Sequence, residues 1–205
     1  MQNAKETSMI KRFMKKKSTT IFLVLVGMYI ALGLANKSFL NYENLASLAR
    51  STAYTAILAF GELLVILICG IDLSVGSVCG LSAVTAALLV SKAGWAMIPA
   101  ILVALLAGIV VGGVNGGLIV GFQLPPFIAT MGTTQIIKSV ALLLTDGKPV
   151  LGLGSDFLFI GQGKILYIPV AMWIMIVVAI IGSLFLNKTV TGRKLYALGG
   201  GEEAA

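Results

Sequence analysis

The chain has 205 residues, of which 58% are hydrophobic and 11% are charged, and its mean hydropathy is +1.01. A soluble domain cannot bury that much apolar surface in one core, so the composition predicts an integral membrane protein. The net charge of +7 does not indicate a nucleic-acid-binding protein, because the basic residues gather before the first apolar run and after the last one. Histidine is absent and both cysteines lie within apolar runs, so neither a histidine-based metal site nor a disulfide framework is expected.

Apolar runs define the predicted elements. Crossing about 30 Å of hydrocarbon takes roughly 17 to 25 helical residues. In chain order, the runs of that length are residues 19–36, 53–69, 75–91, 97–120, 127–145 and 165–186. The sequence therefore predicts an all-α, polytopic membrane protein with about six transmembrane helices, some of them discontinuous.

Basic residues predict the orientation of these helices. Six lie before the first run and three follow the last, whereas five lie in loops that would face outward. Positive charge is enriched in cytoplasmic flanks, so we expect a cytoplasmic N-terminus over 1–18, a transmembrane domain over 19–186 and a cytoplasmic segment over 187–205. The joints near "GIDLS" and "GFQLPP" contain no Lys or Arg. Each is either an aqueous loop or a break within the membrane.

An aspartate interrupts the apolar sequence in "CGIDLSVGS", residues 69–77. A charged residue at the centre of a membrane helix costs about 2.5 to 3.5 kcal/mol, so this one needs compensation. Gly70 can end one helix, while Asp72 and Ser74 are suited to cap the next one by accepting its free N–H groups. A compatible alternative is that Asp72 lines a translocation path beside a discontinuous helix. Glu62 has no capping position and must face protein, water or a partner.

A polar stripe marks the fifth predicted helix, which begins "PPFIATMGTTQIIKS". Thr130, Thr134 and Lys138 recur every four residues and so share one helical face, with Gln135 beside it. Such a stripe faces a pore or a neighbouring helix rather than lipid. Lys138 has a second interpretation, in which its amine reaches the outer headgroups. The predicted translocation path comprises Asp72, Ser74, Thr130, Thr134, Gln135 and Lys138.

Glycines in "GIVVGGVNGGLIVG" repeat at four-residue spacing. Small residues let helix backbones approach closely in lipid, so these positions are predicted to be packing surfaces without a chemical role. Asn115 among them is expected to form an interhelical hydrogen bond. The predicted packing residues are Gly108, Gly112, Gly113, Asn115, Gly116 and Gly117.

Catalytic motifs are missing from the sequence. Gly147-Lys148 and Gly163-Lys164 lack the earlier glycine and the following Ser or Thr of a Walker A loop. No nucleophile-base pair or metal-ligand cluster is visible. We therefore expect a transport protein that is not an enzyme and that binds neither a metal nor a cofactor. Any ATP chemistry must come from another chain.

Three separated motifs carry a resemblance to a known family: "GIDLSVGSVCGLSA", "VNGGLIVGFQLPPFIATMGTTQI" and "TGRKLYALGGGEEAA". Together they resemble the permease subunit of bacterial ATP-binding-cassette importers for monosaccharides, the ribose and galactoside branch. The resemblance covers most of the chain from about residue 45. It implies a multi-pass protein of the bacterial cytoplasmic membrane with its N-terminus in the cytoplasm.

The resemblance also implies partners. Such permeases pair with a second, here presumed identical, permease subunit and receive sugar from an extracytoplasmic binding protein. Separate ATPase subunits, which use ATP and Mg²⁺, drive them. The family's "EAA" coupling region, which docks on the ATPase, maps to Gly199, Gly200, Glu202, Glu203, Ala204 and Ala205. Family members continue beyond this motif, so we expect a truncated or partial sequence.

The sequence leaves two functional hypotheses. One is the permease of an ATP-driven importer for a monosaccharide such as ribose. The other is a secondary carrier in which Glu62 and Asp72 bind a coupling ion or proton. Dependence of uptake on ATP or on a proton gradient separates the two.

Overall fold

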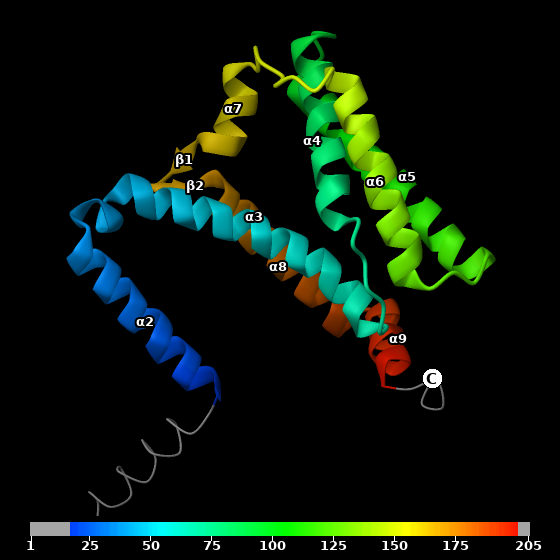
Figure 1. Cartoon of the computed structure of the whole chain (residues 1–205), viewed down its shortest axis with the longest axis horizontal. Coiled ribbons are helices and arrows are strands. Elements are labelled where there is room, and N and C mark those ends of the chain that lie inside the picture. The colour runs from blue at the N-terminus through cyan, green and yellow to red at the C-terminus, as the bar shows by residue number, and fades with distance from the viewer. Residues whose placement is uncertain (1–16, 201–205) are drawn as a thin grey trace, which may run out of the picture. The chain divides into compact units, whose positions relative to one another are not determined.

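The computed structural model of the protein describes residues 17–200. This described part contains eight α-helices, one short 3-10 helix and one two-stranded hairpin (Figure 1). The predicted all-α membrane fold is thereby confirmed. The chain divides into two compact units, residues 1–48 and 49–205. Each unit is described by itself.

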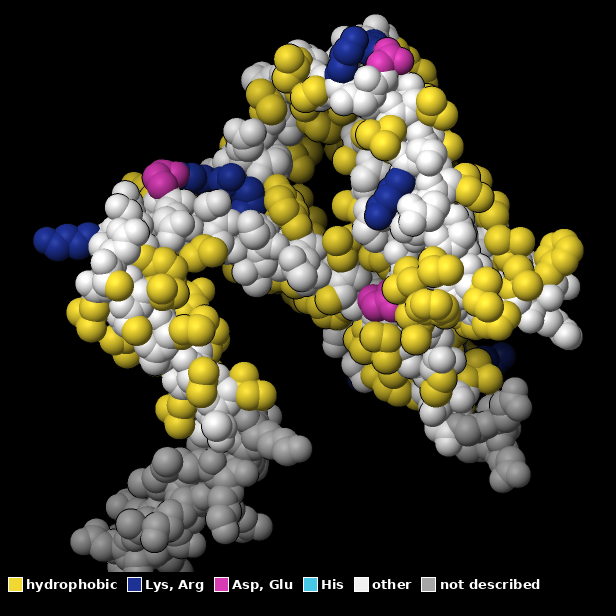
Figure 2. Space-filling model, in the orientation of Figure 1, with side chains coloured by type: hydrophobic (Ala, Val, Ile, Leu, Met, Phe, Trp, Pro, Cys, Tyr) yellow, Lys and Arg dark blue, Asp and Glu magenta, His cyan; other side chains and the backbone are white. Residues whose placement is uncertain are grey.

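The first unit contains α2 (Lys17–Ala35), η1 (Lys37–Leu40) and the beginning of α3 (Tyr42–Leu67). Apolar side chains project from all around α2, as is typical of a helix surrounded by lipid (Figure 2). Asn36 follows α2 and caps the start of η1, where its side chain accepts a hydrogen bond from the Ser38 amide at 2.9 Å. The rings of Tyr29 and Phe39 meet edge to face at 5.5 Å. These contacts hold the turn between α2 and α3.

The second unit holds the remaining helices and the hairpin. In chain order they are α4 (Val75–Ser91), α5 (Met97–Gly121), α6 (Pro126–Thr145), α7 (Ser155–Gln162), β1 (Lys164–Ile165), β2 (Ile168–Pro169), α8 (Val170–Lys188) and α9 (Val190–Gly199). Among the described residues, α3, α5, α6 and α8 are long and apolar enough to cross a membrane. The apolar helices over Thr19–Ala35 and Val75–Ser91 are shorter. These six helices correspond to the six predicted runs.

Three details differ from the sequence prediction. Helix α3 begins at Tyr42, whereas the predicted run begins at residue 53. The last spanning helix begins at Val170, not near residue 165, because residues 164–169 form an antiparallel hairpin that pairs Lys164 with Pro169. Pro169 has a fixed φ and no N–H, so it suits the position just before a helix. Helix α7 was also not predicted. It has only 8 residues, too few for a periodic apolar pattern to stand out from the flanking loop.

Helices α4, α5 and α6 lie side by side, and α4 contacts both of the others (Figure 1). Their shared interior consists mainly of small side chains, including Ala86, Ala100, Ala104 and Ala129. Small residues allow close backbone approach, which is the main source of packing energy where lipid removes the hydrophobic drive. The Ser82 hydroxyl, for example, donates to the Ala104 carbonyl across the α4–α5 contact at 3.0 Å.

Contacts within the second unit show which ends of its helices lie together. Gly199 of α9 lies against the Leu67 carbonyl at the end of α3. At the opposite ends, the last turns of α4 and α6 line one pocket together with the loop after α6. Helix directions therefore alternate as the spanning pattern predicts, with the joint at 68–74 and α9 at the same end.

This alternation predicts which positions are accessible from each side of the membrane. After Cys69 and Cys79 are replaced by serine, single cysteines at Gln123 and Lys194 should react with an impermeant maleimide from the cytoplasmic side. A cysteine at Leu151, which is 80% exposed, should react from the outside. One spanning helix separates residue 151 from each of the other two. Labelling of all three from a single side would show that α6 and α8 do not span.

Candidate functional site

The candidate site is the joint between α3 and α4, residues 68–74, together with the polar side chains that surround it. Helix α3 ends at Leu67, and Cys69 adopts a left-handed conformation with φ 58°. The amides of Cys69 and Gly70 donate to the carbonyls of Ile66 and Val65, both at 2.9 Å. These bonds close the helix end. A side chain on Gly70 would collide with Val65, so glycine is required there for close approach, while the left-handed turn falls on Cys69.

Asp72 organises the start of α4. Its Oδ1 accepts hydrogen bonds from the Ser74 amide at 2.7 Å and the Ser74 hydroxyl at 2.6 Å. The aspartate thus satisfies an N–H group at the beginning of the next helix, in the manner of an Asx turn. Ser74 is the N-cap residue, yet its hydroxyl makes no capping bond. That hydroxyl is instead directed towards Asp72 and α5.

Glu62 reaches the same joint from α3. Its Oε1 accepts the Asp72 amide at 3.3 Å, and its side chain is half-buried. The sequence predicted that Glu62 faces protein, water or a partner, and in the structure it contacts protein. Two carboxylates thus hold backbone N–H groups of one short segment. A joint without such acceptors would leave these donors without a partner in the chain.

Helix α6 supplies the next set of contacts. The Thr130 hydroxyl accepts the Leu73 amide at 3.1 Å, and the Thr134 hydroxyl donates to the Leu73 carbonyl at 2.9 Å. Both hydroxyls can also bond to carbonyls of their own helix, at 2.8 Å in each case. The predicted stripe thus faces a neighbouring segment of the chain at Thr130 and Thr134. It binds backbone groups of the joint there.

Asn115 joins α4, α5 and α6 in one network. Its Nδ2 donates to the Ser74 hydroxyl at 2.9 Å, and its Oδ1 accepts from the Thr133 hydroxyl at 2.6 Å. Ser74, Asn115 and Thr133 are all buried. Asn115 therefore makes hydrogen bonds to both neighbouring helices. Sequence reasoning did not include Thr133, although its spacing of three residues from Thr130 places it beside the predicted stripe.

The joint lies deeper than the end of the α5–α6 hairpin. Leu73 is hydrogen-bonded to Thr130 and Thr134, which lie four and eight positions after Pro126, the first residue of α6. At 1.5 Å per residue, this places Leu73 about 6 to 12 Å along α6. The joint at 122–125 connects the ends of α5 and α6 directly. The sequence left both joints as either an aqueous loop or a break within the membrane. Of the two, the joint at 68–74 is the one that is inset among neighbouring helices.

The other predicted path residues lie apart from this network. Gln135 and Lys138 are exposed, and the side chain of neither one makes a hydrogen bond or ion pair with the described residues. They follow Thr134 along α6, beyond the residues that are bonded to the joint. The structure thus brings together Asp72, Ser74, Thr130 and Thr134. Gln135 and Lys138 remain free to meet lipid, water or another subunit.

The glycines of α5 differ in their surroundings. A side chain at Gly108 would contact Val78 and Ser82 of α4 at 3.6 Å, so this glycine lies in the α4–α5 contact. A side chain at Gly112, Gly113, Gly116 or Gly117 would meet no atom within 4 Å. Those four positions are open surface in this chain. Their role in helix packing stays a prediction.

The coupling residues are only partly described. Gly199 is the last residue of α9, and Gly200 caps it through hydrogen bonds to carbonyls of the preceding turn. Thr189 closes the other end of α9 by accepting the Gly192 amide at 3.0 Å. Glu202, Glu203, Ala204 and Ala205 lie outside the described residues. Among the described residues, no group of three or more acidic, His or Cys side chains could hold a metal ion.

The network predicts a measurable contribution of Asn115 to stability. Asn115→Leu should lower the free energy of unfolding in detergent by about 1 kcal/mol, because two buried interhelical hydrogen bonds are lost while hydroxyl partners can turn elsewhere. Asn187→Leu is the matched control, since the Asn187 amide bonds only to Ser183 on its own helix. Equal effects of the two substitutions on unfolding would contradict a stabilising role for the network.

Thr134 should hold the joint through its hydroxyl alone. Thr134→Val keeps the side-chain shape but leaves the Leu73 carbonyl without this donor, so amide hydrogen exchange over residues 69–74 should be faster as the joint opens more often. Ser139→Ala is the control, because the Ser139 hydroxyl donates only to Gln135 of the same helix. Unchanged hydrogen exchange over residues 69–74 in Thr134→Val would mean that the hydroxyl bonds only within α6.

Comparisons with known proteins place the chain in a family. The family model for the permease component of branched-chain amino acid transport systems matches residues 44–205. The ribose import permease protein RbsC of Haemophilus influenzae is 37% identical, with 100% of this chain aligned to 64% of that protein. RbsC of Bacillus subtilis is 41% identical, with 90% of this chain aligned to 58% of that protein.

A further relative is named for a different solute. The autoinducer 2 import system permease protein LsrC of Enterobacter sp. is 32% identical, with 96% of this chain aligned to 57% of that protein. The chain thus spans less than two thirds of the length of these curated relatives. No solved structure matches it. Because the family model matches well over half of the chain, the protein belongs to the branched-chain amino acid transport permease component family.

Proposed function

We propose that this chain belongs to the permease subunit of an ATP-driven importer that translocates a monosaccharide such as ribose. The observation that carries the proposal is the identity of 37% and 41% to two ribose import permeases, against 31–32% to the autoinducer 2 permeases. The importer would include ATPase subunits that use ATP and Mg²⁺, an extracytoplasmic sugar-binding protein and a second, identical permease subunit. It would reside in the bacterial cytoplasmic membrane, with its N-terminus in the cytoplasm.

The chemistry of the described helices suits a neutral solute. A sugar needs hydrogen-bonding groups along its path and no charged counter-site, and weakly bonding Thr, Ser and Gln side chains avoid trapping it. Thr130 and Thr134 already bond to the joint. We infer that they reach the path only where the joint moves, whereas Gln135 and Lys138 are accessible throughout. Sugar passage would thus depend on the conformation of residues 68–74.

The packing of α9 supports a route by which ATPase movement reaches this joint. Gly199, at the start of the proposed coupling region, lies against the Leu67 carbonyl. The joint follows Leu67 directly, and Asp72 within it is bonded to Glu62 and Ser74. Closure of the ATPase subunits on α9 would shift the population between two arrangements of the joint. Alternating access would follow from that shift.

The roles of the two carboxylates separate this proposal from a secondary carrier. Asp72→Asn keeps an oxygen that can accept the Ser74 amide, so ATP-driven ribose uptake should stay within about threefold of the parent value. Asp72→Ala removes the acceptor and should lose most uptake. The measurement uses the complete permease in proteoliposomes with its ATPase and binding protein, with the proton gradient collapsed by an ionophore.

Two results would contradict the proposal. One is uptake that ceases with the ionophore but continues without ATP, together with full loss of uptake in Asp72→Asn and Glu62→Gln. That result would identify ion or proton coupling through ionisable groups. The other is ATP-dependent uptake of leucine or autoinducer 2 with no uptake of ribose. That result would agree with an ATP-driven importer but would identify a solute other than ribose.

A further inference from the structure

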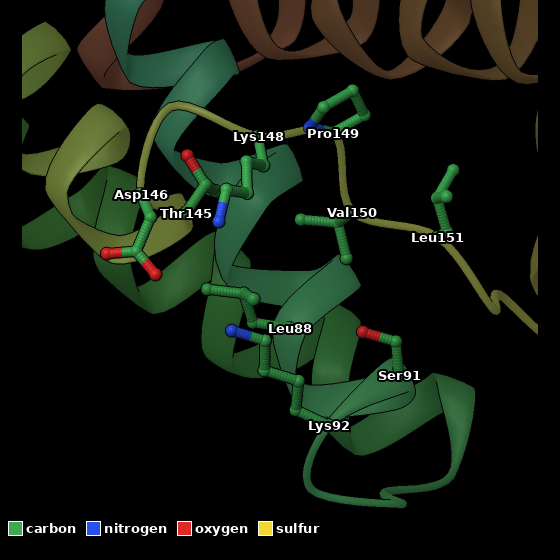
Figure 3. A pocket seen from close by; sticks show the side chains of 9 residues that line it. All are labelled: Leu88, Ser91, Lys92, Thr145, Asp146, Lys148, Pro149, Val150 and Leu151. Carbon is green, nitrogen blue, oxygen red and sulfur yellow. The ribbon is translucent and has the colours of Figure 1, made fainter.

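A second polar site lies at the end of the α4–α6 bundle opposite the joint. The last turn of α4, the end of α6 and the loop that follows α6 enclose a pocket of about 340 Å³ (Figure 3). Ser91 and Lys92 come from α4, and Asp146 and Lys148 come from the end of α6 and the loop. Figure 3 shows the ammonium groups of both lysines and the Asp146 carboxylate on the same side of this space. Figure 2 shows charged side chains gathered at this end of the bundle.

Polar groups in this pocket lack partners within the chain. The Ser91 hydroxyl is buried and has no hydrogen-bond partner. Neither lysine makes an ion pair or side-chain hydrogen bond with any residue that the structure describes. Because the Ser91 hydroxyl is closed off from solvent, the polar groups that are open to a ligand are the exposed ammonium groups of the two lysines.

The lysines are also not needed to cap the helices. Backbone amides already bind the terminal carbonyls of α4, since Lys92 and Trp95 donate to Leu88 and Leu89 at 2.9 Å. In α6, the Gly147 amide donates to the Leu142 carbonyl at 2.9 Å. Both ammonium groups therefore remain available for an external anion.

The remaining walls of the pocket are apolar and come from Leu88, Pro149, Val150 and Leu151. Leu151 is 80% exposed. Helix α6, which ends here, is long and apolar enough to cross a membrane. The pocket at its end is therefore expected at the depth of lipid headgroups, where lysines attract phosphate and apolar side chains meet the glycerol region. A soluble anion would gain no favourable contact from that apolar wall.

We propose that this pocket binds the headgroup of an aminophospholipid such as phosphatidylethanolamine. Lys92 and Lys148 bind the phosphodiester. The Asp146 carboxylate accepts hydrogen bonds from the primary ammonium of the lipid. A quaternary ammonium has no N–H to donate, so phosphatidylcholine binds less well. The site is independent of which solute the permease transports.

The test measures lipid retained by the complete permease after equilibration in mixed micelles with equal amounts of phosphatidylethanolamine and phosphatidylcholine, using native mass spectrometry. The parent protein should retain phosphatidylethanolamine about tenfold over phosphatidylcholine, as one charge-assisted hydrogen bond implies. The double variant Lys92→Gln, Lys148→Gln should lose retention of both lipids. Lys37→Gln with Lys188→Gln is the control, since both lysines lie outside the pocket.

A second variant tests the carboxylate separately. Asp146 has φ 52°, a left-handed conformation that asparagine adopts readily, so Asp146→Asn should fold normally. It should keep phospholipid but lose the preference for ethanolamine over choline. Equal lipid retention in the parent and the double-lysine variant would overturn the proposal, as would a site emptied by inorganic phosphate. Normal lipid retention with failed docking of the binding protein would assign the lysines to a protein partner instead.

Discussion

The described part of the chain depends on one constraint: the backbone polar groups of the α3–α4 joint lie outside a regular helix and need other hydrogen-bond partners. Each unpaired group would cost several kcal/mol in hydrocarbon. Side chains of α3, of α6 and of the joint itself meet this requirement. Glu62 accepts the Asp72 amide, Asp72 accepts the Ser74 amide, and threonines of α6 bind both backbone groups of Leu73. The cost of an aspartate within the apolar sequence is thereby offset.

This requirement also explains the packing around the joint. The joint is inset beside α6, so α4 has only 17 residues and is shorter than the helices beside it. Small side chains along α4, α5 and α6 bring their backbones close enough for Ser74, Asn115 and Thr133 to form one hydrogen-bonded chain. The same polar network therefore fixes the depth of the joint and the arrangement of the three helices.

In the importer proposed above, the position of the joint would link ATPase movement to transport. Gly199 of α9 contacts the carbonyl of the residue that ends α3, and the joint begins at the next residue. A permease needs a segment that is held firmly enough to close a path and weakly enough to release it. Several hydroxyl groups of the joint network have a second acceptor on their own helix, so they can exchange partners without losing a hydrogen bond.

Sequence alone determined the membrane class, six apolar helices and the family, because hydrocarbon sets the length and composition of spanning segments. It also identified Asp72, Ser74, Thr130 and Thr134, since polar residues are conspicuous in apolar runs. Only the tertiary structure decided their partners. The depth of the joint, the inclusion of Thr133 and the exposure of Gln135 depend on how helices distant in sequence pack together. Helical periodicity places side chains on a face, and it does not specify what that face meets.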